Sequence, residues 1–548
     1  MGMRRWFLAA LMLLALSVQA QPVYKYWVEF TDKNQSPYRS DNPSEYLGPR
    51  ALERRARMRI QIDSLDLPVS PAYVDALQQE GLTVVHRCKW LNGVIAWSAD
   101  SLGEDREWPE FVREVKLCEV SPLSIPDTDV PNVGYPLPEY DFDTLYGADY
   151  YGGGYIQISQ MNGQLLHRCG YRGEGVVIGV CDCGFPGVDT AAIFGSMRRE
   201  GRLLATRDFV WPEENDVFNI HSHGTHALST MAVLSPGLYV GTAPKASYVL
   251  CRTENVLLES LLEEYNWAVA AEWLDSLGAD VVSTSLGYFY FDDSTQSYSL
   301  QDLDGRTAPM SRAAAVAVSR GMVVVNSAGN EGLSVPQHLN VPADVPEVLT
   351  VGAVDSAGVR ADFSSYGPTA SLCTKPDVMA MGAQVLSASP DGLFRYTNGT
   401  SLSCPIMAGM MACLCQRFPR LSPRQLCDSV RAWGSLAAFP DRFSGYGIPD
   451  FGRAVEGTVG VNKCGETSTM RIYPNPARDY ITVDCNFGSS QMPTDCLLTV
   501  YDVMGRRVIS YVLHEAACRV PLQELPDGIY FVSIRTPNGT SQQKLIKR

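Results

Sequence analysis

Val176-Val177-Ile178-Gly179-Val180-Cys181-Asp182 is an apolar, mostly β-branched run that ends in an acidic residue. Runs of this kind, without polar alternation, are typical of strands buried on both faces of a parallel sheet. Helix-like segments, such as 257–277 and 312–320, separate the runs. The strand-like runs cover residues 176–181, 246–251, 281–285, 322–326 and 348–354. We therefore expect an α/β fold whose doubly wound, mostly parallel sheet carries helices on both faces.

Four polar residues occupy positions where such a sheet concentrates its chemistry, at the carboxyl ends of strands. Asp182 ends the first strand, and Asn330 follows a later strand after a short turn. His223 and Ser401 each stand at the start of a helix-like run. A carboxylate, an imidazole, a hydroxyl and an amide donor are the parts that a serine nucleophile needs.

These residue types predict the role of each group. We expect His223 to take the proton of Ser401 and Asp182 to orient His223. The amide of Asn330 and the backbone N–H of Ser401, at a helix amino terminus, are the expected donors to the oxyanion. Pro405 is expected in the first turn of that helix, where a missing N–H costs nothing.

The segments around these residues resemble the subtilisin-like serine peptidases, the subtilases, over roughly residues 145–456. Asp, His and Ser follow that family's order. Other segments are similar to the family's sequence motifs: Gly241-Thr242-Ala243-Pro244, Ser285-Leu286-Gly287, Ala328-Gly329-Asn330-Glu331-Gly332 and Lys375-Pro376-Asp377. After the serine, the family commonly reads Met-Ala-Ser-Pro, whereas this chain reads Leu402-Ser403-Cys404-Pro405. The resemblance implies a subtilisin-like catalytic domain with polypeptide substrates. It also implies that Ser285, Leu286, Gly287, Ala328 and Gly329 bind the substrate.

Two segments suggest metal ions. The histidines of His221-Ser222-His223-Gly224-Thr225-His226 favour a ligand set only weakly, because no Cys or Glu nearby in sequence completes it with zinc spacing. Segment 288–305 contains the acidic residues Asp292, Asp293, Asp302 and Asp304. These carboxylates are candidate calcium ligands, and a solvated acidic loop is the alternative. The expected chemistry requires no cofactor, with calcium as a possible structural ion.

The chain has 15 cysteines, an odd number that leaves one thiol unpaired if all pairing is intramolecular. Cys181 and Cys183 flank Asp182 on the predicted strand, so both should point away from the carboxylate as packing residues. Cys404 lies three residues after Ser401 on the same helix. We expect a bulky thiol reagent to reach it and inhibit.

Composition and the amino terminus indicate export. Arg4 and Arg5 precede an apolar run, and Val18-Gln19-Ala20 is a signal-peptidase site, so residues 1–20 form a predicted signal peptide. No other run is long enough to predict a transmembrane segment after signal removal. The net charge of −15 argues against a polyanionic partner such as nucleic acid.

Residues 21–125 precede the catalytic motifs and show both strand and helix patterns. The predicted strands are 24–31, 82–86 and 92–97, and the predicted helices are 49–60 and 71–80. A small α+β module at this place in subtilases is usually a propeptide, and the alternative is a permanent accessory domain. Residues 126–144 read as a proline-rich linker.

The character of the chain changes again after the catalytic domain, predicted as 145–456. Residues 457–468 read as a linker, and 469–548 alternate as the strands of a small β-sandwich. Three segments resemble the carboxyl-terminal sorting domain of the type IX secretion pathway: Ile472-Tyr473-Pro474-Asn475-Pro476-Ala477-Arg478-Asp479, Val500-Tyr501-Asp502-Val503-Met504-Gly505-Arg506 and Leu525-Pro526-Asp527-Gly528-Ile529-Tyr530. A carbohydrate-binding or adhesion module is the alternative. The resemblance implies the type IX secretion machinery as a partner, passage through the periplasm, and release or attachment at the outer-membrane surface.

Together these features predict a secreted serine endopeptidase, made as a precursor, that hydrolyses peptide bonds through an acyl-enzyme. A catalytically silent surface protein, which keeps the fold as a peptide-binding groove, is the alternative.

Overall fold

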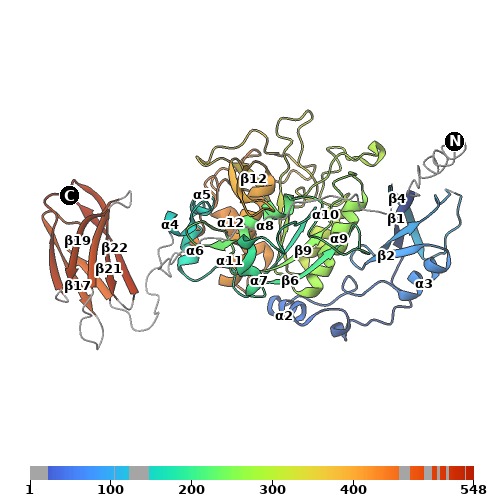
Figure 1. The fold of residues 1–548 in the computed structure, drawn as a ribbon, viewed down its shortest axis with the longest axis horizontal. Coiled ribbons are helices and arrows are strands. Elements are labelled where there is room, and N and C mark those ends of the chain that lie inside the picture. Colours follow the sequence, from blue (N-terminus) through green and yellow to red (C-terminus); the bar gives the residue numbers. More distant parts are fainter. Residues whose placement is uncertain are drawn as a thin grey trace, which may run out of the picture. The chain divides into compact units, whose positions relative to one another are not determined.

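The computed structural model describes residues 22–103, 105–122, 147–455, 469–486, 496–502, 507–513, 517–536 and 539–548. The chain divides into two compact units, Met1–Val455 and Glu456–Arg548. Figure 1 shows the helices and strands of both units. The predicted signal peptide and both predicted linkers lie outside the described residues.

A seven-stranded sheet organises the first unit, with the order β13-β12-β11-β10-β5-β9-β6. Every neighbouring pair in it is parallel, which confirms the predicted sheet type. The strands are β5 (Val177–Asp182), β6 (Leu203–Asp208), β9 (Ser247–Arg252), β10 (Val281–Thr284), β11 (Val323–Ser327), β12 (Leu349–Val354) and β13 (Val378–Met381). Two short antiparallel pairs accompany it: β7 (Leu234–Ser235) with β8 (Tyr239–Val240), and β14 (Val385–Ala388) with β15 (Phe394–Thr397).

Helices cover both faces of this sheet, as the side chains of β5 demonstrate. Ile178 and Val180 belong to the core that includes helices α8 and α11, whereas Val177 and Cys181 belong to the core that includes α9 and α10. The helices of the first unit are α2 (Pro49–Met58), α3 (Pro71–Gln79), α4 (Ala148–Tyr151), α5 (Tyr155–Ser159), α6 (Gln164–Arg168), α7 (Gly195–Arg199), α8 (His223–Ala232), α9 (Leu262–Leu277), α10 (Pro309–Ser319), α11 (Thr400–Arg417) and α12 (Pro423–Ala432). Short 3-10 helices are η1 (Pro43–Glu45), η2 (Ala192–Phe194), η3 (Ser294–Gln296) and η4 (Phe451–Val455).

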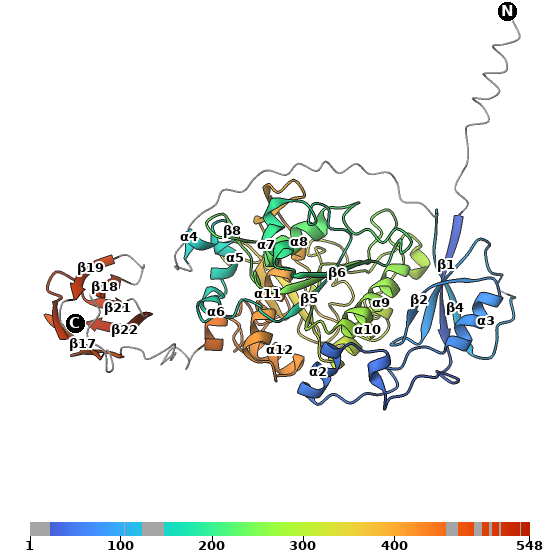
Figure 2. The same cartoon turned by 60° about the horizontal axis from the view of Figure 1, so that its bottom comes forward.

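The amino-terminal module has its own antiparallel sheet, ordered β2-β3-β1-β4. Its strands are β1 (Pro22–Phe30), β2 (Thr83–Cys88), β3 (Gly93–Ser98) and β4 (Val112–Pro122). One face of this sheet shares the core of α9 and α10, and the ring of Trp27 stacks on Tyr265 of α9 with centroids 4.3 Å apart. Figure 2 shows the module beside these helices. The module is therefore packed on the catalytic sheet's helical layer.

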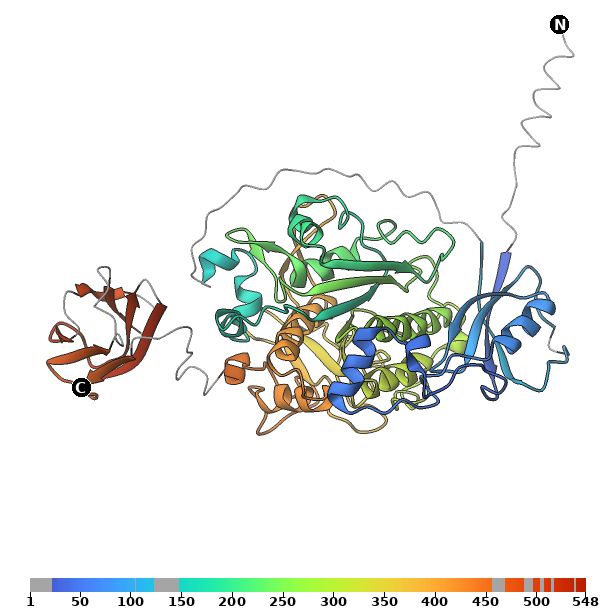
Figure 3. The ribbon, with the colours of Figure 1, turned by 90° about the horizontal axis from the view of Figure 1, so that it is seen from below.

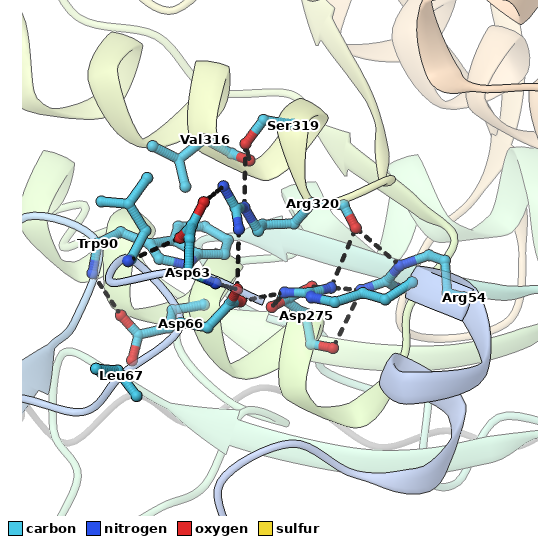
Figure 4. A network of polar contacts seen from close by, with 12 residues as sticks. Arg54, Asp63, Asp66, Leu67, Trp90, Asp275, Val316, Ser319 and Arg320 are labelled. Atoms are coloured by element: carbon cyan, nitrogen blue, oxygen red, sulfur yellow. Dashed lines mark hydrogen bonds and ion pairs between the residues drawn. The ribbon is translucent and has the colours of Figure 1, made fainter. Parts of the chain in front are cut away.

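Helix α2 reaches further along the catalytic domain and makes a buried ionic network with α9 and α10. It lies beside α9 in Figure 3. Arg54 and Arg55 both pair with Asp275 of α9, and Arg55 also pairs with Asp66 at 2.6 Å. Arg320, which follows α10, pairs with Asp66 at 2.9 Å; Figure 4 shows this network from close by.

The second unit has two antiparallel sheets, ordered β16-β17-β20 and β19-β18-β21-β22. The strands are β16 (Thr469–Tyr473), β17 (Tyr480–Asn486), β18 (Cys496–Asp502), β19 (Arg507–Leu513), β20 (Ala517–Pro521), β21 (Gly528–Thr536) and β22 (Gly539–Lys547). Ile481 and Val483 of one sheet share a single core with Val500 and Val532 of the other. This arrangement is the predicted β-sandwich.

Among the described residues, no helix has the length and apolar character required to cross a bilayer. The twelve cysteines whose side chains the structure describes are all unpaired thiols.

Candidate active site

Asp182 is the last residue of β5, a strand buried along its whole length. Its side chain is fully buried, and its Oδ1 accepts hydrogen bonds from the backbone N–H of Cys183 at 2.8 Å and from His223 Nδ1 at 2.7 Å. The other oxygen, Oδ2, has no hydrogen-bond partner. A buried carboxylate that meets an imidazole in this way fixes the tautomer with a proton on Nδ1.

His223 is the first residue of α8, and its side chain is 30% exposed. Thr225 anchors this end of the helix, because its hydroxyl donates to the carbonyl of Pro186 in the loop after β5. Burial alone would lower the pKa of His223, but the charge and the hydrogen bond of Asp182, with a smaller contribution from Glu254, raise that pKa above its ordinary value. The imidazole therefore holds a proton more firmly than a free histidine does.

Ser401 lies in the first turn of α11 and reaches the same end of the sheet through Ser285. The hydroxyl of Ser285 donates to the carbonyl of Ser401 at 2.8 Å, and the hydroxyl of Ser401 donates to the carbonyl of Ser285 at 3.4 Å. Ser285 follows β10, whose last residue is in register with Cys181, the neighbour of Asp182. The two hydrogen bonds with Ser285 therefore hold Ser401 at the strand end that carries the Asp182–His223 pair.

Pro405 lies beyond the first turn of α11, which corrects the expectation from the sequence. The helix begins at Thr400, so residue 405 is where an N–H would donate to the carbonyl of Ser401. Proline has no N–H, and the hydroxyl of Ser285 supplies the hydrogen bond that this carbonyl would otherwise lack.

Asn330 follows β11 after a turn in which Gly329 has a φ of +103°, a conformation that favours glycine. The side-chain oxygen of Asn330 accepts from the backbone N–H of Thr400 at 2.9 Å and from its hydroxyl at 3.2 Å. Since the oxygen faces α11, the amide nitrogen faces the other way, at an exposed position. This geometry leaves the donor end of Asn330 available to a bound group.

The predicted substrate-binding residues follow two neighbouring strands, β10 and β11. The backbone N–H groups of Ala328 and Gly329 already donate to Val351 and to Thr400, and the carbonyl of Gly329 accepts from Ser365. These three backbone groups are therefore already engaged within the fold, and the two residues can form a wall of the site. The segment Ser285-Leu286-Gly287, beside the Ser401 helix, remains the predicted partner of the substrate backbone.

Two predictions about cysteines were wrong. Cys404 is fully buried, and its thiol donates to the carbonyl of Thr284 at 3.2 Å. Burial raises the pKa of this thiol to about 12, so a bulky reagent has no path to a reactive thiolate.

Cys183 lies just after β5, and its thiol turns towards the carboxylate of Asp182. Its Sγ is 3.3 Å from Asp182 Oδ1 and 3.2 Å from His221 Nδ1. Strand alternation ends with the strand, so it says nothing about the next side chain.

Glu254 and Tyr288 border the site, although the sequence did not predict a role for Glu254. Burial raises the pKa of Glu254 to about 8, and its carboxylate accepts from the hydroxyl of Tyr288 at 2.7 Å. The sequence indicated this only through the position of Glu254, two residues after β9, at the edge of the sheet where the carboxyl ends of the strands lie.

The acidic segment 288–305 does not gather its carboxylates around one point. Asp293 and Asp304 accept hydrogen bonds from backbone N–H groups two and three residues later in their own turns, and Asp302 accepts from Ser299. Asp292 accepts from the backbone of Glu259. None of the four belongs to a group with ligand geometry within the part of the chain that the structure describes.

Comparison with known proteins gives three family matches. The model of the Subtilase family matches residues 173–447, that of the Peptidase S8 propeptide domain, Bacteroidota, matches 25–129, and that of the Secretion system C-terminal sorting domain matches 471–548. Subtilisin NAT of Bacillus subtilis subsp. natto is 33% identical over 278 residues, which are 50% of this chain and 64% of that protein.

Two further relatives show the same pattern. Subtilisin of Bacillus pumilus is 32% identical over 278 residues, 50% of this chain and 89% of that protein. A cold adapted subtilisin-like serine proteinase of known crystal structure is 25% identical, with 51% of this chain and 88% of that chain covered and a TM-score of 0.38. The match to the Subtilase family, residues 173–447, contains the seven-stranded sheet and all four candidate catalytic residues.

Proposed function

The chain belongs to the subtilase family, and we propose that it is a secreted serine endopeptidase, made as a precursor, in which Ser401 is the nucleophile. The observation that carries the proposal is the 2.7 Å hydrogen bond between His223 Nδ1 and the buried Asp182, at the same strand ends as Ser401. This pair leaves Nε2 of His223 as the basic nitrogen.

In the proposed reaction, His223 takes the proton of Ser401 as the hydroxyl oxygen attacks the scissile carbonyl carbon. Asp182 stabilises the imidazolium that results. The negative charge on the former carbonyl oxygen is held by the amide of Asn330 and by the backbone N–H of Ser401 at the amino terminus of α11. His223 then protonates the leaving amine, and water releases the acyl group by the same steps.

The proposed substrates are polypeptides in extended conformation. In this proposal the three residues after β10 pair with such a chain, while Ala328 and Gly329 form the facing wall. The proposal assigns Ser285, Leu286 and Gly287 to the backbone of the substrate.

The proposed chemistry uses only side chains and backbone groups of this chain, so it needs no organic cofactor. A calcium ion remains a proposal as a structural ion, and the acidic segment 288–305 is not favoured as its site, because its carboxylates serve their own turns.

Residues 25–129 match a propeptide and 471–548 match a secretion sorting domain, so the chain is an exported precursor. We propose that the type IX secretion machinery is the partner of the carboxyl-terminal unit. The exact domain limits, 21–125, 145–456 and 469–548, remain predictions.

A fluorophosphonate probe tests the proposed function. We expect the processed protein to be labelled at Ser401 and the Ser401→Ala variant to remain unlabelled, because only an activated hydroxyl attacks the phosphorus. Cleavage of a peptide library by the same sample would then give the side-chain preference. A wild-type protein that is processed and folded but unlabelled would instead identify the silent, peptide-binding class.

A further inference from the structure

A cavity of about 380 Å³ lies between the amino-terminal module and the catalytic domain. The module contributes β2 and the turn that follows it, and the catalytic domain contributes α9 and Arg207 of β6. Figure 2 shows β2 beside α9. The volume lies within the range of about 300–1,000 Å³ that small-ligand sites occupy. The lining shares no residue with the candidate active site.

Cationic side chains outnumber carboxylates among the residues that line this cavity. Arg87, Lys89 and Arg207 carry positive charge, and Glu272 is the sole acidic residue of the lining. Burial raises the pKa of Glu272, so its carboxylate opposes the cations less than an exposed carboxylate would. The cavity is therefore locally positive in a chain whose net charge is −15.

Lys89 lies in the turn after β2 and is a buried cation, with only 5% of its surface exposed. Its ammonium has no hydrogen bond or ion pair with any residue that the structure describes. Glu272 serves the backbone of this turn instead, because its Oε2 accepts from the N–H groups of Lys89 at 2.6 Å and Trp90 at 3.3 Å. A buried charge is normally paired and hydrogen-bonded. The ammonium of Lys89 is thus available to an anion in the cavity that it lines.

Arg207 offers a second cation from the catalytic domain. Its guanidinium lies over the rings of Phe209 at 4.8 Å and Trp273 at 5.6 Å, and it makes no hydrogen bond with the described residues. Stacking of this kind fixes the plane of the guanidinium and leaves its N–H groups free for a two-pronged contact with an oxyanion.

His86 of β2 lies beside these cations and is also incompletely bonded. Its Nε2 donates to the carbonyl of Phe209 at 2.9 Å, whereas its Nδ1 is buried without a hydrogen-bond partner in the described part of the chain. Burial lowers the pKa of His86 to about 4, and the charge of Arg207 acts in the same direction. A negative charge in the cavity would oppose both effects and favour a proton on Nδ1.

We propose that this cavity binds a phosphate-class oxyanion between Lys89 of the module and Arg207 of the catalytic domain. Two cations match the double charge of phosphate better than the single charge of a carboxylate. Since one cation comes from each part, the site is complete only while the module is docked. By linkage, the bound anion stabilises the docked module and delays the appearance of active peptidase. The delay rests on the proposed function, whereas the binding does not.

Binding is measured in the full-length Ser401→Ala chain, in which self-processing by Ser401 cannot occur. Isothermal titration with inorganic phosphate at constant ionic strength should show one site, and phosphate should raise the midpoint of thermal unfolding. Lys89→Met removes the charge but fills a similar volume, so the chain should fold and lose at least about tenfold in phosphate affinity. Lys89→Arg should restore binding. Acetate, with a single charge, should reproduce neither effect.

Arg207→Gln should weaken phosphate binding to a similar extent. Arg106→Gln is its matched control and should leave the affinity unchanged. Arg106 also stacks on a tryptophan, at 4.5 Å, but it already pairs with Glu80 at 3.0 Å and does not line the cavity. Equal phosphate affinity in Lys89→Met, Arg207→Gln and the parent chain, or equal binding of acetate, would overturn the site.

The effect on activation is measured with the Ser401-competent protein, as a time course of fluorophosphonate labelling after refolding. Phosphate should delay the labelling of this protein, and Lys89→Met should give the same time course with and without phosphate. Binding with no delay would overturn the role in activation. A protein that binds phosphate but is never labelled would refute the proposed function alone.

Discussion

At the scale of single residues, the candidate site depends on how one buried carboxylate is shared. Asp182 accepts from His223 and from the backbone and thiol of Cys183 through one oxygen. The backbone N–H and the thiol of Cys183 are uncharged donors, so the negative charge of Asp182 acts mainly on the imidazole of His223. A substitution of Asp182 should therefore change the pKa of His223 more than any other property of the site.

Activity should rise with pH through the pKa of His223, because only the neutral imidazole can act as a base. Asp182 raises that pKa, so the acidic limb of a plot of kcat/KM against pH should lie above the ordinary value of about 6.5. In Asp182→Asn, burial acts without the opposing charge, and the limb should move to lower pH as activity falls. Residual activity with an unmoved limb would show that His223 is not the titrating base.

Asn330→Ala should lower kcat about 10²–10³-fold, a magnitude borrowed from the loss of an oxyanion donor in subtilisin itself. KM should change little, because the charge on the oxygen develops only in the transition state. Thermal unfolding checks that the fold is intact. Leu339→Ala, in a small core next to the same segment, is a useful contrast, since it should lower stability rather than kcat alone. An Asn330→Ala enzyme with nearly full kcat would contradict the assignment.

At the scale of elements, five strands of the seven-stranded sheet follow from their apolar runs, whereas β6 and β13 were not predicted. Two further differences, at β4 and α9, have identifiable causes. Strand β4 was missed because its charged residues, Arg113, Glu114, Lys116 and Glu119, interrupt the apolar pattern without a regular period. Helix α9 begins at Leu262, later than predicted, because the carboxylate of Glu263 accepts from the backbone of Asn255 and Ser260 and closes the preceding loop. Side-chain hydrogen bonds of this kind have no periodic signature.

Ser285→Ala should destabilise the protein by about 1–3 kcal/mol, because the carbonyl of Ser401 would lose its donor inside α11. Pro405→Ala restores an N–H at the position that normally serves this carbonyl. A double-mutant cycle by denaturant unfolding should therefore show that Ser285→Ala costs about 1 kcal/mol less when residue 405 is alanine. Strict additivity of the two substitutions would refute the compensation.

At the scale of the whole molecule, the amino-terminal module is joined to the catalytic domain by charge as well as by apolar packing. Arg54 and Arg55 meet Asp275 in an almost fully buried network. Removing one partner of a buried pair leaves an uncompensated charge, which costs about 3–5 kcal/mol. The stability of the precursor should therefore depend on this network.

We expect Arg55→Ala in the full-length chain to weaken the attachment of the module and to bring forward the appearance of fluorophosphonate-reactive protein. A time course of labelling after refolding measures this. Arg39→Ala is the matched control in the same module, because the Arg39–Asp41 pair is exposed and such pairs contribute only about 0–1 kcal/mol. Identical time courses for the two variants would show that the network does not hold the module in place.

The amino-acid sequence by itself determined the sheet type and the order of the catalytic motifs. It also determined the organisation of the chain into an amino-terminal module, a catalytic domain and a carboxyl-terminal β-sandwich. These features depend on local patterns, such as apolar runs, turn residues and short motifs, that the chain carries wherever it folds. They were sufficient to place Asp182 at a strand end and Ser401 at a helix start.

Only the tertiary structure decided which side chains meet where regular elements end. Cys183 and His221 are far apart in sequence, and their contact depends on two loops that pass closely at Gly184. Likewise, the hydroxyl of Ser285 serves a helix more than a hundred residues away. Loop geometry is set by long-range packing rather than by the periodicity of apolar side chains, so a single sequence contains no local signal for such contacts.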